Sequence, residues 1–83
     1  MTFTTLNYIK NMLDTEIDKR RKMIADAKHG LEELYADTGY TGWTPDEELG
    51  PLGAYYRKAL AEDKEKLRKA EAALEEFLAH SWN

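Results

Sequence analysis

Residues that break helices are confined to one short window of this 83-residue chain. Both prolines and four of the five glycines fall between residues 39 and 53. Because glycine and proline are the strongest local breakers, this window predicts a connector. The rest of the chain is rich in Ala, Leu, Glu and Lys, has no Val and has only three Ile, a composition typical of helices. We therefore predict a single all-α domain over 1–83, with helices at about 5–37 and 52–81 and a connector at 38–51.

Apolar residues recur along both expected helices at spacings of three, four or seven, as one helix face requires. The connector is long enough for an antiparallel hairpin, and aromatic residues gather near the connector and near the two chain ends. Each apolar stripe is wider than a two-helix seam, so a second apolar surface needs a cover. We expect a homodimer that forms a four-helix bundle; the alternative is a different, unidentified protein partner.

Local signals predict the helix ends. Thr4 is the expected N-cap of the first helix, and Gly39 is its expected left-handed C-cap. In the connector, Thr44-Pro45-Asp46-Glu47 predicts one short helical turn, with Thr44 as its cap, Pro45 at N1 and Glu47 at N3. Gly50 is expected to stop this turn before Pro51 opens the second helix. Gly30 interrupts the first helix and marks either a bend or a close helix contact.

Composition excludes several functional classes. With no Cys, the chain has no disulfide, thiolate nucleophile or Cys-based metal site, which fits the cytoplasm. The net charge of -4 disfavours direct binding to nucleic acid, and no apolar run is long enough for a membrane helix. His29 and His80 lack ligand spacing, and Ser81 is the sole serine. We therefore expect no cofactor, no metal and no enzyme activity.

Two charged residues, Arg20 and Asp63, fall on the apolar seams. With Leu34 beside Tyr56, Arg20 would lie opposite about Ala70, so we do not expect the two charges to meet within one hairpin, although a dimer could join them. A buried polar pair would fix the helix register or the choice of partner. We favour the simpler interpretation that both side chains reach water past small neighbours.

Two candidate protein-binding surfaces stand out. The first is the basic stretch at residues 19–22, with Arg20, Arg21 and Lys22 as its candidates, although such runs are usually solvated. The second is the connector, where Tyr40, Trp43 and Leu49 are the candidate contacts. For Trp43 we favour a ring that folds back onto the end of the hairpin over an exposed anchor.

These observations predict a non-catalytic protein–protein interaction or adaptor protein that acts through a self-associating hairpin. The chain matches no family motif, but as a class it is similar to small acidic accessory proteins of phages and mobile elements. Some of these inhibit a host enzyme, including a defence nuclease, as anti-CRISPR proteins do. An inhibitor of this kind would use an acidic surface against a basic channel; a small structural or assembly protein is a further alternative. The acidic candidates are Asp46, Glu47, Glu48, Glu71, Glu75 and Glu76.

Overall fold

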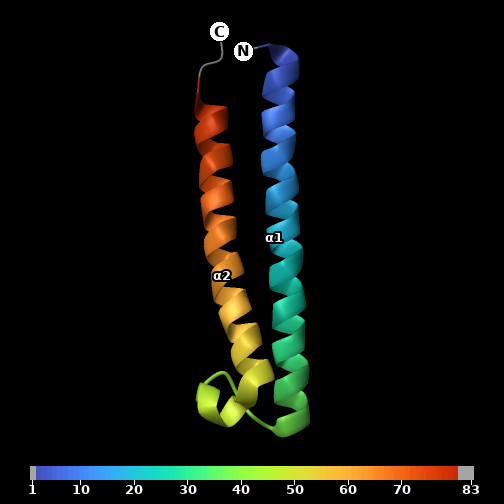
Figure 1. The fold of residues 1–83 in the computed structure, drawn as a ribbon, viewed down its shortest axis with the longest axis vertical. Helices are drawn as coiled ribbons and strands as arrows, with labels where there is room; N and C mark the ends of the chain where they lie inside the picture. The colour runs from blue at the N-terminus through green and yellow to red at the C-terminus, as the bar shows by residue number, and fades with distance from the viewer. Residues whose placement is uncertain (1, 81–83) are drawn as a thin grey trace.

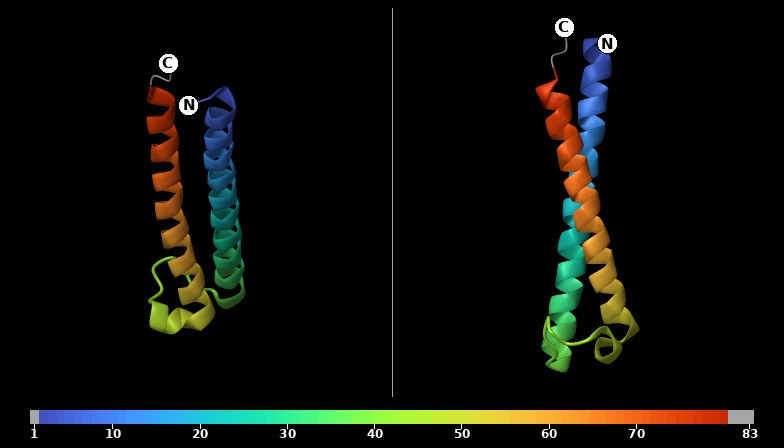
Figure 2. Two further views of the ribbon diagram at one scale, coloured as in Figure 1. Left: turned by 45° about the horizontal axis from the view of Figure 1, so that its top comes forward. Right: turned by 90° about the vertical axis from the view of Figure 1, so that its left-hand side faces the viewer.

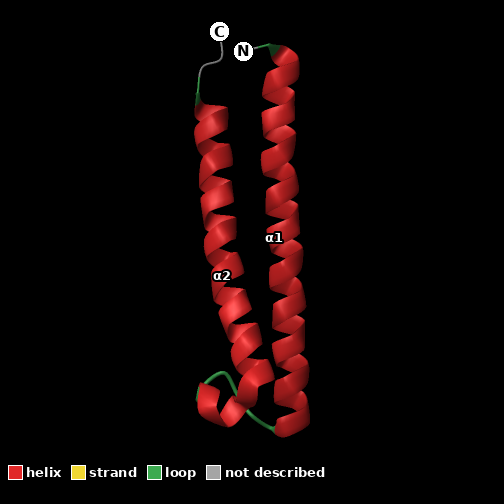
Figure 3. Cartoon of the chain, viewed as in Figure 1, coloured by secondary structure: helices red, strands yellow, loops and turns green. Residues whose placement is uncertain are grey.

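The computed structural model describes residues 2–80, which form two long antiparallel helices (Figure 1). Helix α1 spans Phe3–Thr38 and helix α2 spans Asp46–Ala79. The described residues contain no strand (Figure 3). The rod measures 56 × 15 × 15 Å, with the connector at one end (Figure 1). The predicted all-α hairpin is confirmed, and neither helix has an apolar stretch long enough to cross a bilayer.

Helix α1 begins earlier than the sequence pattern indicated. Thr2 is its N-cap, because the Thr5 N–H donates to Thr2 Oγ1 at 3.2 Å, so the prediction of Thr4 as cap is wrong. At the other end, Gly39 adopts φ 75° and its N–H donates to the Tyr35 carbonyl at 2.9 Å. The left-handed cap at Gly39 is therefore confirmed.

Helix α2 contains the predicted break at Gly50, where φ is 89° and ψ is 174°. A short turn precedes this break, and the long segment begins at Pro51. Pro45 is the N-cap of the short turn, so the prediction of Thr44 as cap is wrong: Thr44 Oγ1 instead accepts a hydrogen bond from the Thr41 N–H at 3.0 Å. Helix α2 ends at Ala79, and the expected end near Ser81 lies outside the described residues.

The core is a thin seam between two helices that cross at an angle (Figure 2). Its buried members are Ile17, Ile24, Ala27, Leu31, Leu49 and Ala70, together with the charged Asp63. No side chain among residues 2–80 falls below 2% exposure, because two helices alone cannot surround any residue.

Gly30 marks a close contact between the helices. Helix α1 continues through it without a break, and the Tyr56 ring lies over it. A Cβ added at Gly30 would lie 2.6 Å from Tyr56 Cζ, closer than two such atoms can approach. Of the two interpretations of this glycine, the structure supports the contact.

Candidate protein-interaction surface

A buried ion pair joins the two helices near their middle. Arg20 Nη1 lies 3.0 Å from Asp63 Oδ1, and the two side chains are only 13% and 7% exposed. Arg20 Nε also donates to Glu16 Oε1 at 2.6 Å. This hydrogen bond is the largest cause of a raised pKa at Arg20 and of a lowered pKa at Glu16. Two predictions are therefore wrong: Arg20 and Asp63 do meet within one hairpin, and they do not extend into water.

The pair forms because the helices pack about one turn away from the predicted register. Instead of lying beside Leu34, the Tyr56 ring covers Gly30, and Leu34 packs against Gly53. Both glycines lack the side chain that would block these contacts. The shift brings Asp63 within reach of the long Arg20 side chain.

The predicted basic patch is divided between the interior and the surface. Arg20 turns inward to Asp63, whereas Lys22 is exposed. Arg21 is 62% exposed and lies 3.6 Å from Glu71 of the facing helix, so its charge is partly neutralised. Residues 20–22 therefore do not present one continuous basic surface.

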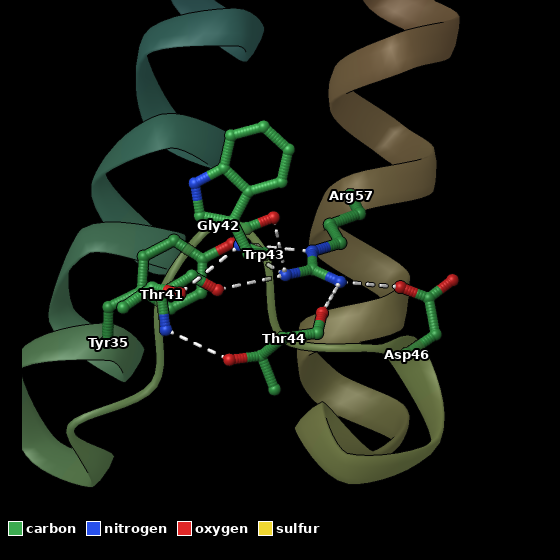
Figure 4. A network of polar contacts seen from close by, with 7 residues as sticks. All are labelled: Tyr35, Thr41, Gly42, Trp43, Thr44, Asp46 and Arg57. Atoms are coloured by element: carbon green, nitrogen blue, oxygen red, sulfur yellow. Dashed lines mark hydrogen bonds and ion pairs between the residues drawn. The ribbon is translucent and has the colours of Figure 1, made fainter.

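Arg57 holds the connector in place (Figure 4). Its guanidinium donates to the Thr44 carbonyl at 2.5 Å, to the Thr41 carbonyl at 3.3 Å and to Tyr35 Oη at 3.1 and 3.3 Å. It also pairs with Asp46 Oδ1 at 2.8 Å, and this hydrogen bond is the largest cause of its raised pKa. Arg57 was not among the predicted contact residues, because a single arginine on a helix has no pattern that marks it.

The three connector candidates differ sharply in exposure. Trp43 is 95% exposed, so the predicted fold-back of its ring onto the hairpin is wrong. Tyr40 is 38% exposed. Leu49 is only 6% exposed and packs against Gly53, which removes it from the contact surface and places it in the core. The reason is the break at Gly50, which turns the short helix back onto the main hairpin.

One long face of the hairpin carries most of the exposed apolar side chains. Met23 of α1 and Tyr55 of α2 line the same hollow on this face, together with Ala59. Other apolar residues lie on the same face by helical spacing, because Met12 precedes Met23 by three turns and Leu52 precedes Tyr55 by one. We call this surface the Met23 face and define it by Tyr8 (65% exposed), Met12 (56%), Met23 (39%), Leu52 (56%) and Tyr55 (65%).

The opposite face is acidic. The predicted residues Glu71 and Glu75 line a shallow groove with two carboxylates of α1, Asp14 and Asp18, beside Arg21. Other acidic candidates lie elsewhere. Glu76 borders a hollow lined by Ile9, Leu13, Ala73 and Phe77, Asp46 is held by Arg57, and Glu47 and Glu48 are exposed in the first turn of α2.

Within residues 2–80, no three His, Cys, Asp or Glu side chains gather as metal ligands. His29 lies 2.9 Å from Glu33 on the helix surface, with both side chains mostly exposed. Ser81 lies outside the described residues. Comparison with known proteins found no matching family model, no matching curated protein and no matching solved structure.

Proposed function

We propose that this chain is a non-catalytic protein-interaction protein whose Met23 face binds a second copy of the hairpin to form a four-helix bundle. The observation that carries the proposal is the exposure of five large apolar side chains on one face, each between 39% and 65% exposed. Water disfavours contiguous exposed apolar surface, and such patches mark interaction sites. A facing pair of helices is the cover that two-layer packing supplies.

The exposed area supports the same proposal. The chain exposes 6248 Å², whereas a compact monomer of 9.6 kDa exposes about 5,100 Å². The excess is about 1,100 Å², and a standard interface buries roughly 800 Å² on each partner. Pairing along the Met23 face would therefore bring the exposed area per chain close to that of an ordinary compact protein.

Sedimentation velocity tests the proposal, with matched variants on the two faces. Met12 and Leu78 are similarly exposed, at 56% and 58%, but Leu78 lines the acidic groove instead of the Met23 face. We expect a dimer for the native chain and for Leu78→Lys, and a shift toward monomer for Met12→Lys. A native chain that stays monomeric at high micromolar concentration would refute the proposed self-association.

The connector offers a second contact point for a different protein. Trp43 is 95% exposed on a loop whose carbonyls are held by Arg57, so the indole is presented from an ordered backbone. Tryptophan on such a support is the residue type most enriched among the dominant contacts of interfaces. We include Trp43 and Tyr40 in the proposed protein-binding surface. Arg21 and Lys22 are exposed candidates that lie nearer the middle of α1, away from the connector.

A second candidate function rests on the acidic groove. Asp14, Asp18, Glu71 and Glu75 line one groove, which suits a basic partner surface such as the nucleic-acid channel of a nuclease. An inhibitor of this type would bind with strong salt dependence. Binding to a nuclease that survives reversal of all four charges would exclude this function.

A further inference from the structure

The charges on the Met23 face follow an order along the rod that bears on how two copies can pair. On α1, Lys19 lies one turn before Met23 and Asp26 lies about one turn after it. On α2, Lys66 and Glu62 border the hollow that Met23 and Tyr55 line. All four charged side chains are exposed.

The observed register places these charges at matching heights. Gly30 contacts Tyr56 and Leu34 contacts Gly53, so residues at the same height have numbers that add to 86 or 87. Lys66 therefore lies near the height of Lys19–Arg20–Arg21, and Glu62 lies near that of Ile24–Ala25. Lys19 and Lys66 thus lie on one side of Met23. Asp26 and Glu62 lie on the other side, where Lys58 lines the same hollow and its Nζ is 4.0 Å from Glu62 Oε1.

On each helix, one position lies midway between the lysine and the carboxylate. On α1 the midpoint between Lys19 and Asp26 is position 22.5, and on α2 the midpoint between Lys66 and Glu62 is position 64. These two positions add to 86.5, which agrees with the register of the hairpin. A single line across the face, at the height of Met23, therefore relates Lys19 to Asp26 on α1 and Lys66 to Glu62 on α2.

We propose that two copies pair antiparallel through the Met23 face, with a twofold axis across the rod at Met23. Each α1 then faces the α1 of the second copy, and each α2 faces the second α2. Lys19 meets Asp26 of the second copy, and Lys66 meets Glu62 of the second copy, giving four opposite-charge contacts across the dimer. This inference rests on the proposed self-association and adds its topology.

One pair of residues on α2, Ala73 and Tyr55, shares this centre. Ala73 and Tyr55 are 18 residues apart, which is five helical turns, and their midpoint is also position 64. Ala73 borders the hollow near the chain ends, and Tyr55 borders the one near the connector. In the antiparallel dimer, the small Ala73 meets the large Tyr55 of the second copy, as interdigitated packing requires.

A parallel pair would oppose like charges. With the twofold axis along the rod, each α1 faces the second α2 at the same height. Lys19 then meets Lys66 of the second copy, and Asp26 meets the region of Glu62. Like charges placed opposite one another disfavour an arrangement, so the charge order selects the antiparallel dimer.

Disulfide trapping tests the topology directly, because the chain has no native Cys. Separate chains carrying Ala73→Cys and Tyr55→Cys are mixed and oxidised, and Ala73→Cys is mixed in parallel with Met12→Cys. We expect a disulfide-linked dimer from the first mixture and little from the second, while circular dichroism confirms that each variant is helical. The opposite result, linkage of Ala73→Cys to Met12→Cys, would overturn the antiparallel topology while leaving self-association intact.

Charge reversal provides an independent test by sedimentation equilibrium. Lys66→Glu opposes two carboxylates at two places in the dimer, and we expect its dissociation constant to rise about tenfold at low salt. The matched control is the exchange Glu62→Lys with Lys66→Glu, which restores opposite charges across the axis and returns affinity to within about threefold of the native value. If the exchange binds as weakly as the single reversal, the proposed pairing is wrong; if the native chain is monomeric, the proposed function fails with it.

Discussion

Replacing Gly30 with Ala separates helix propensity from helix packing. Gly30 lies inside the uninterrupted helix α1, where propensity alone favours Ala by about 1 kcal/mol. Packing instead disfavours Ala here, because a Cβ at this position would lie 2.6 to 2.9 Å from three atoms of the Tyr56 ring. The ring would have to move out of the seam, which disturbs the contact that sets the register.

The two effects have different sizes. Inserting a methyl group into a packed contact costs about 1–3 kcal/mol, which exceeds the gain from propensity. We therefore expect Gly30→Ala to lower the free energy of unfolding by about 1 kcal/mol. In a Tyr56→Leu background the shorter side chain leaves room, so the same substitution should raise that free energy by about 1 kcal/mol. The coupling between the two positions is then about 2 kcal/mol.

Urea denaturation of the four chains, followed by circular dichroism, measures this cycle. All four must be compared at one protein concentration, because self-association stabilises the folded state in a concentration-dependent way. Stabilisation by Gly30→Ala in the native background would falsify the tight contact with Tyr56. Equal effects of the substitution in both backgrounds would also contradict it.

Four further substitutions test other parts of the structure. Asp63→Ala should lower the free energy of unfolding by about 1–2 kcal/mol, because Arg20 keeps its bond to Glu16. Arg20→Met should lower it by more, because Asp63 is then buried without its partner. The reverse order in urea denaturation would show that Asp63 is solvated. Trp43→Ala should change the free energy of unfolding by less than about 0.5 kcal/mol, since the indole is 95% exposed, and a loss above about 1 kcal/mol would mean that the ring packs on the hairpin. The pKa of Glu16 lies below its ordinary value of 4.5 in the folded chain, so its bond to Arg20 contributes stability above that pH and loses it as pH falls through the folded pKa. Glu16→Gln should therefore flatten the fall in melting temperature between about pH 5 and pH 3, and an unchanged slope would contradict this.

The hairpin was predictable because its signals are local. The confinement of glycine and proline to one window set the two helices and the connector, and Gly39 and Gly50 ended helices where expected. Each of these positions acts through its own backbone angles, which neighbouring residues determine. Thr2 and Pro45 show the limit of local signals, since several residues near a helix start can serve as its cap.

The register was not predictable from the apolar stripes, because a stripe that repeats every three to four residues permits several offsets of one turn. The choice among them was made by Tyr56 over Gly30 and by the ion pair of Arg20 with Asp63. Trp43 was mispredicted for a related reason: a preference for burial says nothing about whether a cavity exists to receive the ring. At this end of the rod the indole is 95% exposed.

The ion pair and the proposed dimer depend on the same register. A slip of α2 by one turn would separate Arg20 from Asp63 and leave a carboxylate buried without a partner. The same slip would move the midpoint of Lys66 and Glu62 by about four residues relative to Met23. One twofold axis could then no longer serve both helices. If Lys19 met Asp26 of the second copy, Lys66 would no longer lie opposite Glu62 of the second copy. The buried pair therefore contributes specificity at two levels, since the register that satisfies Asp63 inside one hairpin is also the register that makes the Met23 face complementary to itself.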